Sequence, residues 1–140
     1  MAALKPCNLY DYCVVNGLSL FDVTLPCIFC KHDLSFVALA DFHAKTLQLL
    51  HKDDGCYACC AECLRLSAKF EIENHFQCCV DARFFTTICE KPLHEITVRC
   101  LECYRLLDYI EKFDCCAADS PFCLVRGRWR NLCRHCIKKI

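Results

Sequence analysis

Four Cys-x-x-Cys pairs at repeated intervals constrain this chain more than any other feature. A first pair is followed by a second after 29 intervening residues, and a third pair is followed by a fourth after the same 29. One such pair is weak evidence for a metal site, whereas two copies with identical spacing are strong evidence. The eight cysteines are Cys27, Cys30, Cys60, Cys63, Cys100, Cys103, Cys133 and Cys136.

The two halves of the chain align at a shift of 73 positions, which indicates an internal repeat. Within the stretch CYACCAEC (56–63), this shift places Cys56 and Cys59 on a tryptophan and a leucine, neither of which binds a metal. Cys60 and Cys63 are therefore the predicted ligands in that stretch. Further matches pair Leu34 with Leu107, Phe36 with Tyr109, Val37 with Ile110, Asp41 with Asp114, Ala44 with Ala117, and Leu64 with Ile137.

Four thiolates on two such knuckles suit tetrahedral Zn²⁺, because each knuckle presents two sulfurs on one tight turn. The sequence thus predicts two structural Zn²⁺ ions, each bound by four cysteines. Iron–sulfur ligation and disulfides among the same residues are the alternatives. We expect the other ten cysteines to pack as small apolar side chains.

The cysteine content, 18 of 140 residues, lies above the roughly 8–10% that marks cross-linked or metal-bound chains. A secreted disulfide scaffold is not expected, because the N-terminal MAALKPCNLYDYC is interrupted by Lys5 and Pro6 and shows no signal peptide. No window approaches 18 consecutive apolar residues, so no membrane span is predicted. We expect a reducing compartment and no membrane partner.

The predicted fold class is α+β, with two small zinc-binding modules, each a short antiparallel sheet plus short helices, joined by a linker helix. The runs at 34–39 (LSFVAL) and 122–125 (FCLV) suggest strands, as does HEITVRC before the third pair, and 40–50 suggests a short helix. Apolar residues recur every three or four positions from Ala61 to Val80, which predicts the linker helix. The expected divisions are an N-terminal arm at 1–26, the first module at 27–63, the linker helix and connection at 64–91, and the second module at 92–140.

Charge is unevenly distributed although the formal net charge is zero. Residues 126–140 hold six basic and no acidic residues, which leaves −6 on the first 125. This asymmetry favours an acidic partner near the C-terminal end, or weak nucleic-acid binding.

Taken together, the motifs CIFC with CAEC, CLEC with CRHC, KPLHEITVRC and RGRW resemble one family closely, the E6 oncoproteins of papillomaviruses. The resemblance covers nearly the whole chain. It implies a non-enzymatic adaptor with two zinc modules and a groove, formed by the modules and the linker helix, that captures acidic helical LxxLL peptides of host proteins. The apolar wall that it implies comprises Phe29, Leu47, Leu50, Cys59, Leu64, Ser67 and Phe70, and the cationic residues are Arg99 and Arg128, with Lys52 and Arg126 as weaker candidates.

The partners implied are a HECT-type ubiquitin ligase or a Mastermind-like coactivator, through which host protein degradation, apoptosis, differentiation or transcription would be redirected. Residence in both host nucleus and host cytoplasm is expected, and weak self-association stays an open alternative. Members of this family that are linked to malignancy end in a Ser/Thr-x-hydrophobic tail that PDZ domains bind. Here the last residues are IKKI, with Lys138 at the hydroxyl position, so PDZ binding is not expected.

Single features of the sequence suggest two other functions. A nucleic-acid-binding zinc protein could use the basic C-terminal residues together with Trp129, although the remainder of the chain is acidic. A zinc enzyme is disfavoured because four-cysteine sites leave no open position for water. The six histidines are scattered and form no His-Glu-x-x-His pattern.

Overall fold

The structure is a computed structural model that describes residues 5–137. The chain divides into two compact units, Met1–Leu64 (unit 1) and Arg65–Ile140 (unit 2). The C-terminal residues on which the PDZ expectation rests, 138–140, lie outside the described residues. No helix within residues 5–137 has both the length and the apolarity needed to cross a bilayer.

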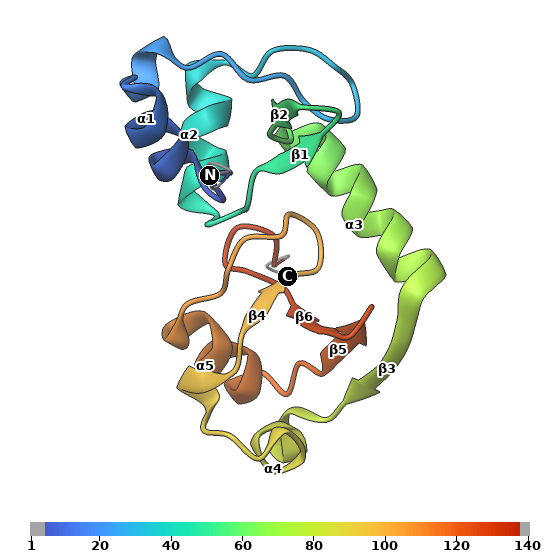
Figure 1. The fold of residues 1–140 in the computed structure, drawn as a ribbon. Helices are drawn as coiled ribbons and strands as arrows, with labels where there is room; N and C mark the ends of the chain where they lie inside the picture. Colours follow the sequence, from blue (N-terminus) through green and yellow to red (C-terminus); the bar gives the residue numbers. More distant parts are fainter. Residues whose placement is uncertain (1–4, 138–140) are drawn as a thin grey trace. The chain divides into compact units, whose positions relative to one another are not determined.

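Unit 1 contains two helices, α1 and α2, followed along the chain by a short β-hairpin (Figure 1). The hairpin pairs Leu50 with Tyr57 in antiparallel register. The buried core of unit 1 includes Leu9, Leu25, Leu39 and Phe42. The elements are α1 (Leu9–Asn16), a 3₁₀ turn (Leu20–Asp22), α2 (Phe36–Ala44), β1 (Leu50–Lys52), β2 (Gly55–Tyr57) and the first turn of α3 (Ala61–His75).

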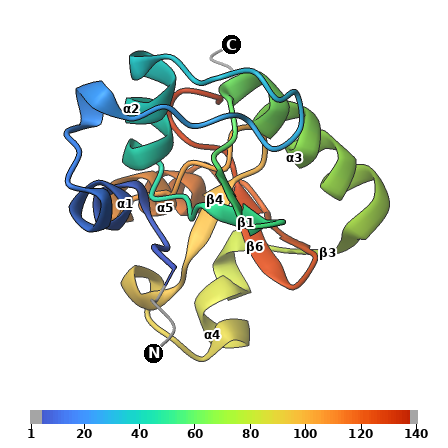
Figure 2. The ribbon, with the colours of Figure 1, turned by 45° about the horizontal axis from the view of Figure 1, so that its top comes forward.

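Unit 2 is built on a four-stranded mixed sheet in the order β3-β5-β6-β4. β5 runs antiparallel to both of its neighbours, whereas β4 pairs with β6 in parallel. Figures 1 and 2 show α4 and α5 beside this sheet. After α3 the elements are β3 (Phe76–Val80), a 3₁₀ turn (Ala82–Phe84), α4 (Phe85–Cys89), a second 3₁₀ turn (Leu93–Glu95), β4 (Val98–Cys100), α5 (Tyr109–Ala117), β5 (Phe122–Val125) and β6 (Arg128–Asn131).

The internal repeat extends well beyond the cysteine pairs. α2 and α5 begin 73 positions apart, and α1 corresponds to the 3₁₀ turn and α4 that span Ala82–Cys89. Cys27 pairs in parallel with Ala58 as Cys100 pairs with Asn131. Residues before Cys27 therefore belong to the repeated unit. The division into 1–26, 27–63, 64–91 and 92–140 stays a prediction.

Both hairpins turn through the same left-handed backbone. Asp53 and Asp54 have φ of 50° and 65°, and Arg126 and Gly127, at the equivalent positions, have φ of 51° and 74°. Two consecutive positive φ angles make the turn type whose twist matches that of the flanking strands. The arginine of the second turn is thereby held at the tip of the β5–β6 hairpin.

Side-chain caps begin α2 and α5, the two helices that the repeat relates. The Ser35 hydroxyl accepts the Ala38 N–H at 3.1 Å before α2, and Asp108 accepts the Glu111 N–H at 2.7 Å before α5. At α5 the cap is reciprocal, because Glu111 accepts the Asp108 N–H in turn. A capping box of this kind satisfies two backbone donors at once.

The core of unit 2 includes the four predicted ligands Cys100, Cys103, Cys133 and Cys136. At its centre the rings of Phe85 and Phe122 stack with centroids 3.8 Å apart, and the edge of Trp129 meets Phe85 at 4.9 Å. The thiols thus lie inside the apolar core rather than at its margin.

Two sequence expectations for the region after Cys30 were wrong. Residues 36–39 of the expected strand LSFVAL form the start of α2, because Ser35 caps a helix that buries Leu39 and Phe42 on one face. The helix expected over 40–50 ends at Ala44, and Leu50 lies in β1 instead. The strand expected at FCLV is confirmed as β5.

The linker helix is confirmed but is shorter than its apolar pattern. α3 begins at Ala61, inside the second knuckle, and ends at His75. Phe76 and Val80, which continue the helical spacing, lie in β3 instead, where pairing with β5 satisfies the backbone. Of the strand-like HEITVRC only Val98–Cys100 is a strand.

We predict that Glu111→Gln destabilises unit 2. The buried carboxylate accepts N–H bonds from Asp108 and, at 2.8 Å, from Arg134. An amide has one acceptor oxygen, so one donor loses its partner, at an expected cost of about 2–3 kcal/mol. Urea unfolding of the zinc-loaded protein measures the change. Glu73→Gln, at an exposed position of α3, is the matched control, and equal losses in the two variants would contradict the assignment.

Candidate metal centres and the arginine pocket

Two clusters of four cysteines lie one in each unit. Within each cluster the four Sγ atoms all lie within 4.8 Å of one another. The clusters differ in exposure, because all four cysteines of unit 2 are buried, whereas in unit 1 Cys27 alone is buried and Cys30 is exposed. The clusters are Cys27, Cys30, Cys60 and Cys63, and Cys100, Cys103, Cys133 and Cys136.

The first knuckle of each cluster is the same turn. The Cys27 N–H donates to His32 O at 2.8 Å, and the Cys100 N–H donates to Arg105 O at 2.8 Å. The turn closes through a left-handed residue, Lys31 in unit 1 and Tyr104 in unit 2, with φ of 66° and 65°. The tight turn brings the paired sulfurs to one side, as a metal knuckle requires.

The second knuckles come from different elements. Cys60 and Cys63 flank the first residues of α3, whereas Cys133 and Cys136 lie in a turn after β6 that is closed by the Cys136 N–H donating to Cys133 O at 3.0 Å. In both units the chain between the knuckles forms a helix and a hairpin. That segment returns the second pair of thiols to the first.

The donor set fits zinc. Tetrahedral bonds of about 2.3 Å place ligand sulfurs about 3.8 Å apart. Cys30 and Cys60 Sγ lie 4.0 Å apart, and Cys103 and Cys133 Sγ lie 3.7 Å apart. The two clusters therefore accommodate two structural Zn²⁺ ions, as the sequence predicted, with every coordination position filled by protein.

Hydrogen bonds within the clusters prepare thiolates for the metal. A side-chain hydrogen bond from Cys103 lowers the pKa of Cys100 to about 4. Burial opposes ionisation of Cys27, but backbone N–H groups of Cys30, Cys60 and Phe29 together lower its pKa to about 6. Thiolate is the form of cysteine that binds zinc.

Cys56 and Cys59 lie outside both clusters. Cys59 is 4% exposed, and burial followed by nearby thiolate charge raises its pKa to about 12. It is therefore a packed apolar side chain at neutral pH. This agrees with the repeat, which pairs these two positions with Trp129 and Leu132.

The residues proposed from the sequence for peptide binding fall into both units. In unit 1, Phe29, Leu50 and Lys52 are exposed, Leu47 is half-buried, and Cys59 and Leu64 are buried. In unit 2, Phe70, Arg126 and Arg128 are exposed, and Ser67 and Arg99 are half-buried.

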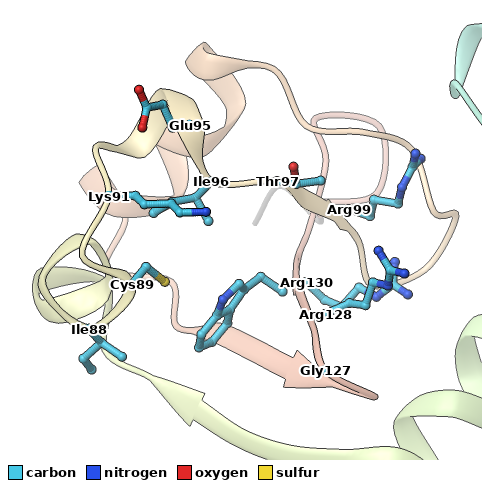
Figure 3. Close-up of a pocket in the computed structure, with 11 residues that line it drawn as sticks. Ile88, Cys89, Lys91, Glu95, Ile96, Thr97, Arg99, Gly127, Arg128 and Arg130 are labelled. Atoms are coloured by element: carbon cyan, nitrogen blue, oxygen red, sulfur yellow. The ribbon is translucent and has the colours of Figure 1, made fainter.

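Unit 2 brings two of these residues together in a pocket of about 420 Å³. Arg99 of β4 and Arg128 of β6 line it with Arg130, and we call this site the arginine pocket (Figure 3). Ile96 and Trp129 supply part of its apolar lining, whereas Arg126 does not line it. Arg130 was not singled out from the sequence, although its spacing of two from Arg128 on a strand was a usable signal.

Arg130 is held by a buried network. Its guanidinium lies 4.6 Å from the centre of the Tyr104 ring and forms an ion pair with Glu71 at 3.5 Å. The Tyr104 hydroxyl donates to the same Glu71 carboxylate. This network fixes α3 to the first knuckle of unit 2 and to β6.

We predict that Cys60→Ser lowers the zinc content from two ions per chain towards one, because a serine hydroxyl is a poor zinc ligand at neutral pH. Cys56→Ser is the matched control and keeps two. Metal analysis after a brief chelator challenge counts the ions. Zinc lost from the Cys56 variant and retained by the Cys60 variant would reverse the ligand assignment.

We also predict that a chelator removes the zinc of unit 1 first, since that cluster is the more exposed. The single tryptophan, Trp129, packs on the core ring of Phe85 and reports on the core of unit 2. The faster phase of zinc release should leave its fluorescence unchanged, and the slower phase should alter it. A fluorescence change during the first phase would contradict this order.

Comparisons with known proteins agree with this arrangement. A family model described as Early Protein (E6) matches residues 27–136, from the first to the last predicted ligand. Protein E6 of human papillomavirus 4 is 47% identical over 139 residues, covering 99% of both chains, and that of human papillomavirus 65 is 45% identical with the same coverage. Protein E6 of human papillomavirus type 60 is 45% identical over 96% of this chain and 94% of its own length. The chain therefore belongs to the E6 family of papillomavirus early proteins.

Proposed function

We propose that this chain is a non-enzymatic viral adaptor that captures acidic helical segments with the LxxLL motif in host proteins. The single observation that carries the proposal is the arginine pocket of unit 2. The resemblance noted from the sequence assigns Arg99 and Arg128 to the acidic residues of such a segment, and both line this pocket.

The charges around the pocket favour an anionic partner. Burial, and then the charges of Arg130 and Arg128, lower the pKa of Arg99. Arg99 donates to Tyr104 O at 2.9 Å, which orients its guanidinium. Arg130 is paired with Glu71, but its buried Nη1 has no hydrogen-bond partner among residues 5–137. A carboxylate in the pocket would relieve this repulsion and accept N–H bonds.

Apolar side chains suited to leucines are exposed on each unit. On α3, Leu66 and Phe70 are 62% and 56% exposed, and in unit 1 Phe29 and Leu50 are 61% and 41% exposed. An amphipathic helix binds by placing its leucines on such surfaces, while cations contact its acidic residues. These residues support the apolar part of the proposal.

The partners that we propose are a HECT-type ubiquitin ligase or a Mastermind-like coactivator. Capture of either would redirect host protein degradation, apoptosis, differentiation or transcription, and we propose activity in host nucleus and cytoplasm. The adaptor role requires no catalytic group. Both zinc clusters are closed sets of four thiols, which suits a structural role for the metal.

A nucleic-acid role is less well supported, because two of the C-terminal arginines already have acidic partners. Arg134 pairs with Asp108 at 2.6 Å and contacts the buried Glu111, and Arg130 pairs with Glu71. Phosphate binding needs several available cations along one face. Of the four arginines that the structure describes in this basic segment, only Arg126 and Arg128 take part in no ion pair.

We predict that Arg128→Glu weakens binding of an acidic LxxLL peptide at least tenfold, a loss of about 1.4 kcal/mol or more. The reversed charge would repel the peptide and attract Arg99 instead. Calorimetric titration of the zinc-loaded protein with one peptide from each proposed partner measures the affinity, and metal analysis should still give two zinc ions.

The matched control is Arg83→Glu, which reverses an exposed arginine of unit 2 outside the pocket. Equal affinities for Arg128→Glu and the unaltered protein would remove the arginine pocket from the proposal. No binding of either peptide by the unaltered protein, together with salt-sensitive binding of duplex DNA, would favour the nucleic-acid alternative.

A further inference from the structure

Outside the zinc clusters, one pair of thiols faces each other across the sheet of unit 2. Cys79 on β3 lies directly opposite Cys123 on β5 in antiparallel register. Their Sγ atoms are 3.3 Å apart. Neither belongs to a metal cluster, and the peptide proposal uses neither of them.

The geometry is close to that of a disulfide. Directly opposed residues of an antiparallel pair have Cβ atoms about 4.5–5.5 Å apart, and a disulfide needs about 3.5–4.5 Å. The sulfurs must approach from 3.3 Å to about 2.05 Å. β3 is the edge strand of the sheet and pairs with β5 alone, so a small shift of β3 disturbs no other strand.

The two thiols differ in environment, which suggests a division of roles. Cys79 is exposed, whereas Cys123 is half-buried. Burial, and then the hydrogen bond with Cys79, raise the pKa of Cys123 to about 12. Cys79 is therefore the sulfur that a dissolved oxidant reaches, and Cys123 is protonated and adjacent to it.

We propose that Cys79 and Cys123 form a redox modification site, at which a peroxide converts the pair into a disulfide between β3 and β5 and thiol reductants reverse it. In the first step the Cys79 thiolate attacks one peroxide oxygen. An S–O bond forms, the O–O bond breaks, and hydroxide leaves and takes up a proton to become water.

In the second step Cys123 sulfur attacks the sulfur of the Cys79 sulfenic acid. The S–S bond forms, the S–O bond breaks, and the departing hydroxide takes the Cys123 proton to become a second water. The two thiols together lose two electrons, which hydrogen peroxide accepts. A dithiol reductant returns both electrons and both protons.

Neighbouring thiols are worse placed. Cys78 is opposite Leu124 rather than a cysteine. Cys115 is buried, and its thiol is directed to Leu132 O at 3.7 Å. The positions of unit 1 that correspond to Cys79 and Cys123 are Pro6 and Leu50, so the repeat does not duplicate the pair.

The test is to treat the zinc-loaded full chain with roughly equimolar hydrogen peroxide while a chromogenic chelator reports released zinc. We expect a loss of about 2 Da per chain before zinc release, reversed by dithiothreitol. Trypsin cleaves after Lys69, Arg83, Lys112 and Arg126, so the link should join peptides 70–83 and 113–126 under non-reducing conditions. Fragment ions then identify the linked residues, because the first peptide also holds Cys78 and the second also holds Cys115 and Cys116.

Serine variants test which two cysteines form the link. Cys79→Ser and Cys123→Ser should each abolish this link at unchanged zinc content, and Cys78→Ser, the matched control one residue away, should retain it. A link that persists in Cys79→Ser, or one that forms only after zinc is released, would overturn the proposal. Fragment ions from the unaltered protein that place the link at Cys78 would overturn it as well, whether or not the variants fold.

Discussion

Coordination of zinc by four thiolates is the interaction on which the rest of this structure depends. The units span residues 1–64 and 65–140, a size at which a hydrophobic core by itself supplies only a few kcal/mol. A structural zinc ion contributes on the order of 10–16 kcal/mol in small modules. In unit 2 the four sulfurs form part of the apolar core beside Phe85 and Phe122. Metal binding and core formation are thus one process there, which is why short strands suffice.

The repeat gives two units with one framework and different surroundings. Helix starts, hairpin turns and knuckle turns recur 73 positions apart. Unit 2 adds the Glu111 capping box, where unit 1 has Ala38, and the ion pair of Arg130 with Glu71. Glu111 accepts the Arg134 N–H inside the second knuckle, and Glu71 orients Arg130 of the pocket. The more exposed cluster of unit 1 has no carboxylate at the position of Glu111, so equivalent ligands are held in unequal environments.

Some features were predictable because they are local and periodic. The spacing of the cysteine pairs identified the ligands, and the shift of 73 excluded Cys56 and Cys59. The prediction of a strand at 34–39 was wrong, although the segment holds β-branched and aromatic residues. Ser35 caps a helix there, and this helix buries Leu39 and Phe42. Helical spacing continued to Val80, but pairing of β3 with β5 ended the helix at His75. Tertiary pairing thereby overrode local preference.

The sequence by itself determined the two metal sites, the repeat, the linker helix and the family, because each depends on residue type and spacing along the chain. Only the tertiary structure decided which cations meet. Arg99 and Arg130 come from β4 and β6, which pair in parallel, and Glu71 reaches Arg130 from α3. The tertiary structure alone also placed Cys79 against Cys123, 44 positions apart in the sequence. Contacts between strands distant in sequence follow from sheet register, and register is set by the packing of the whole unit rather than by any local pattern.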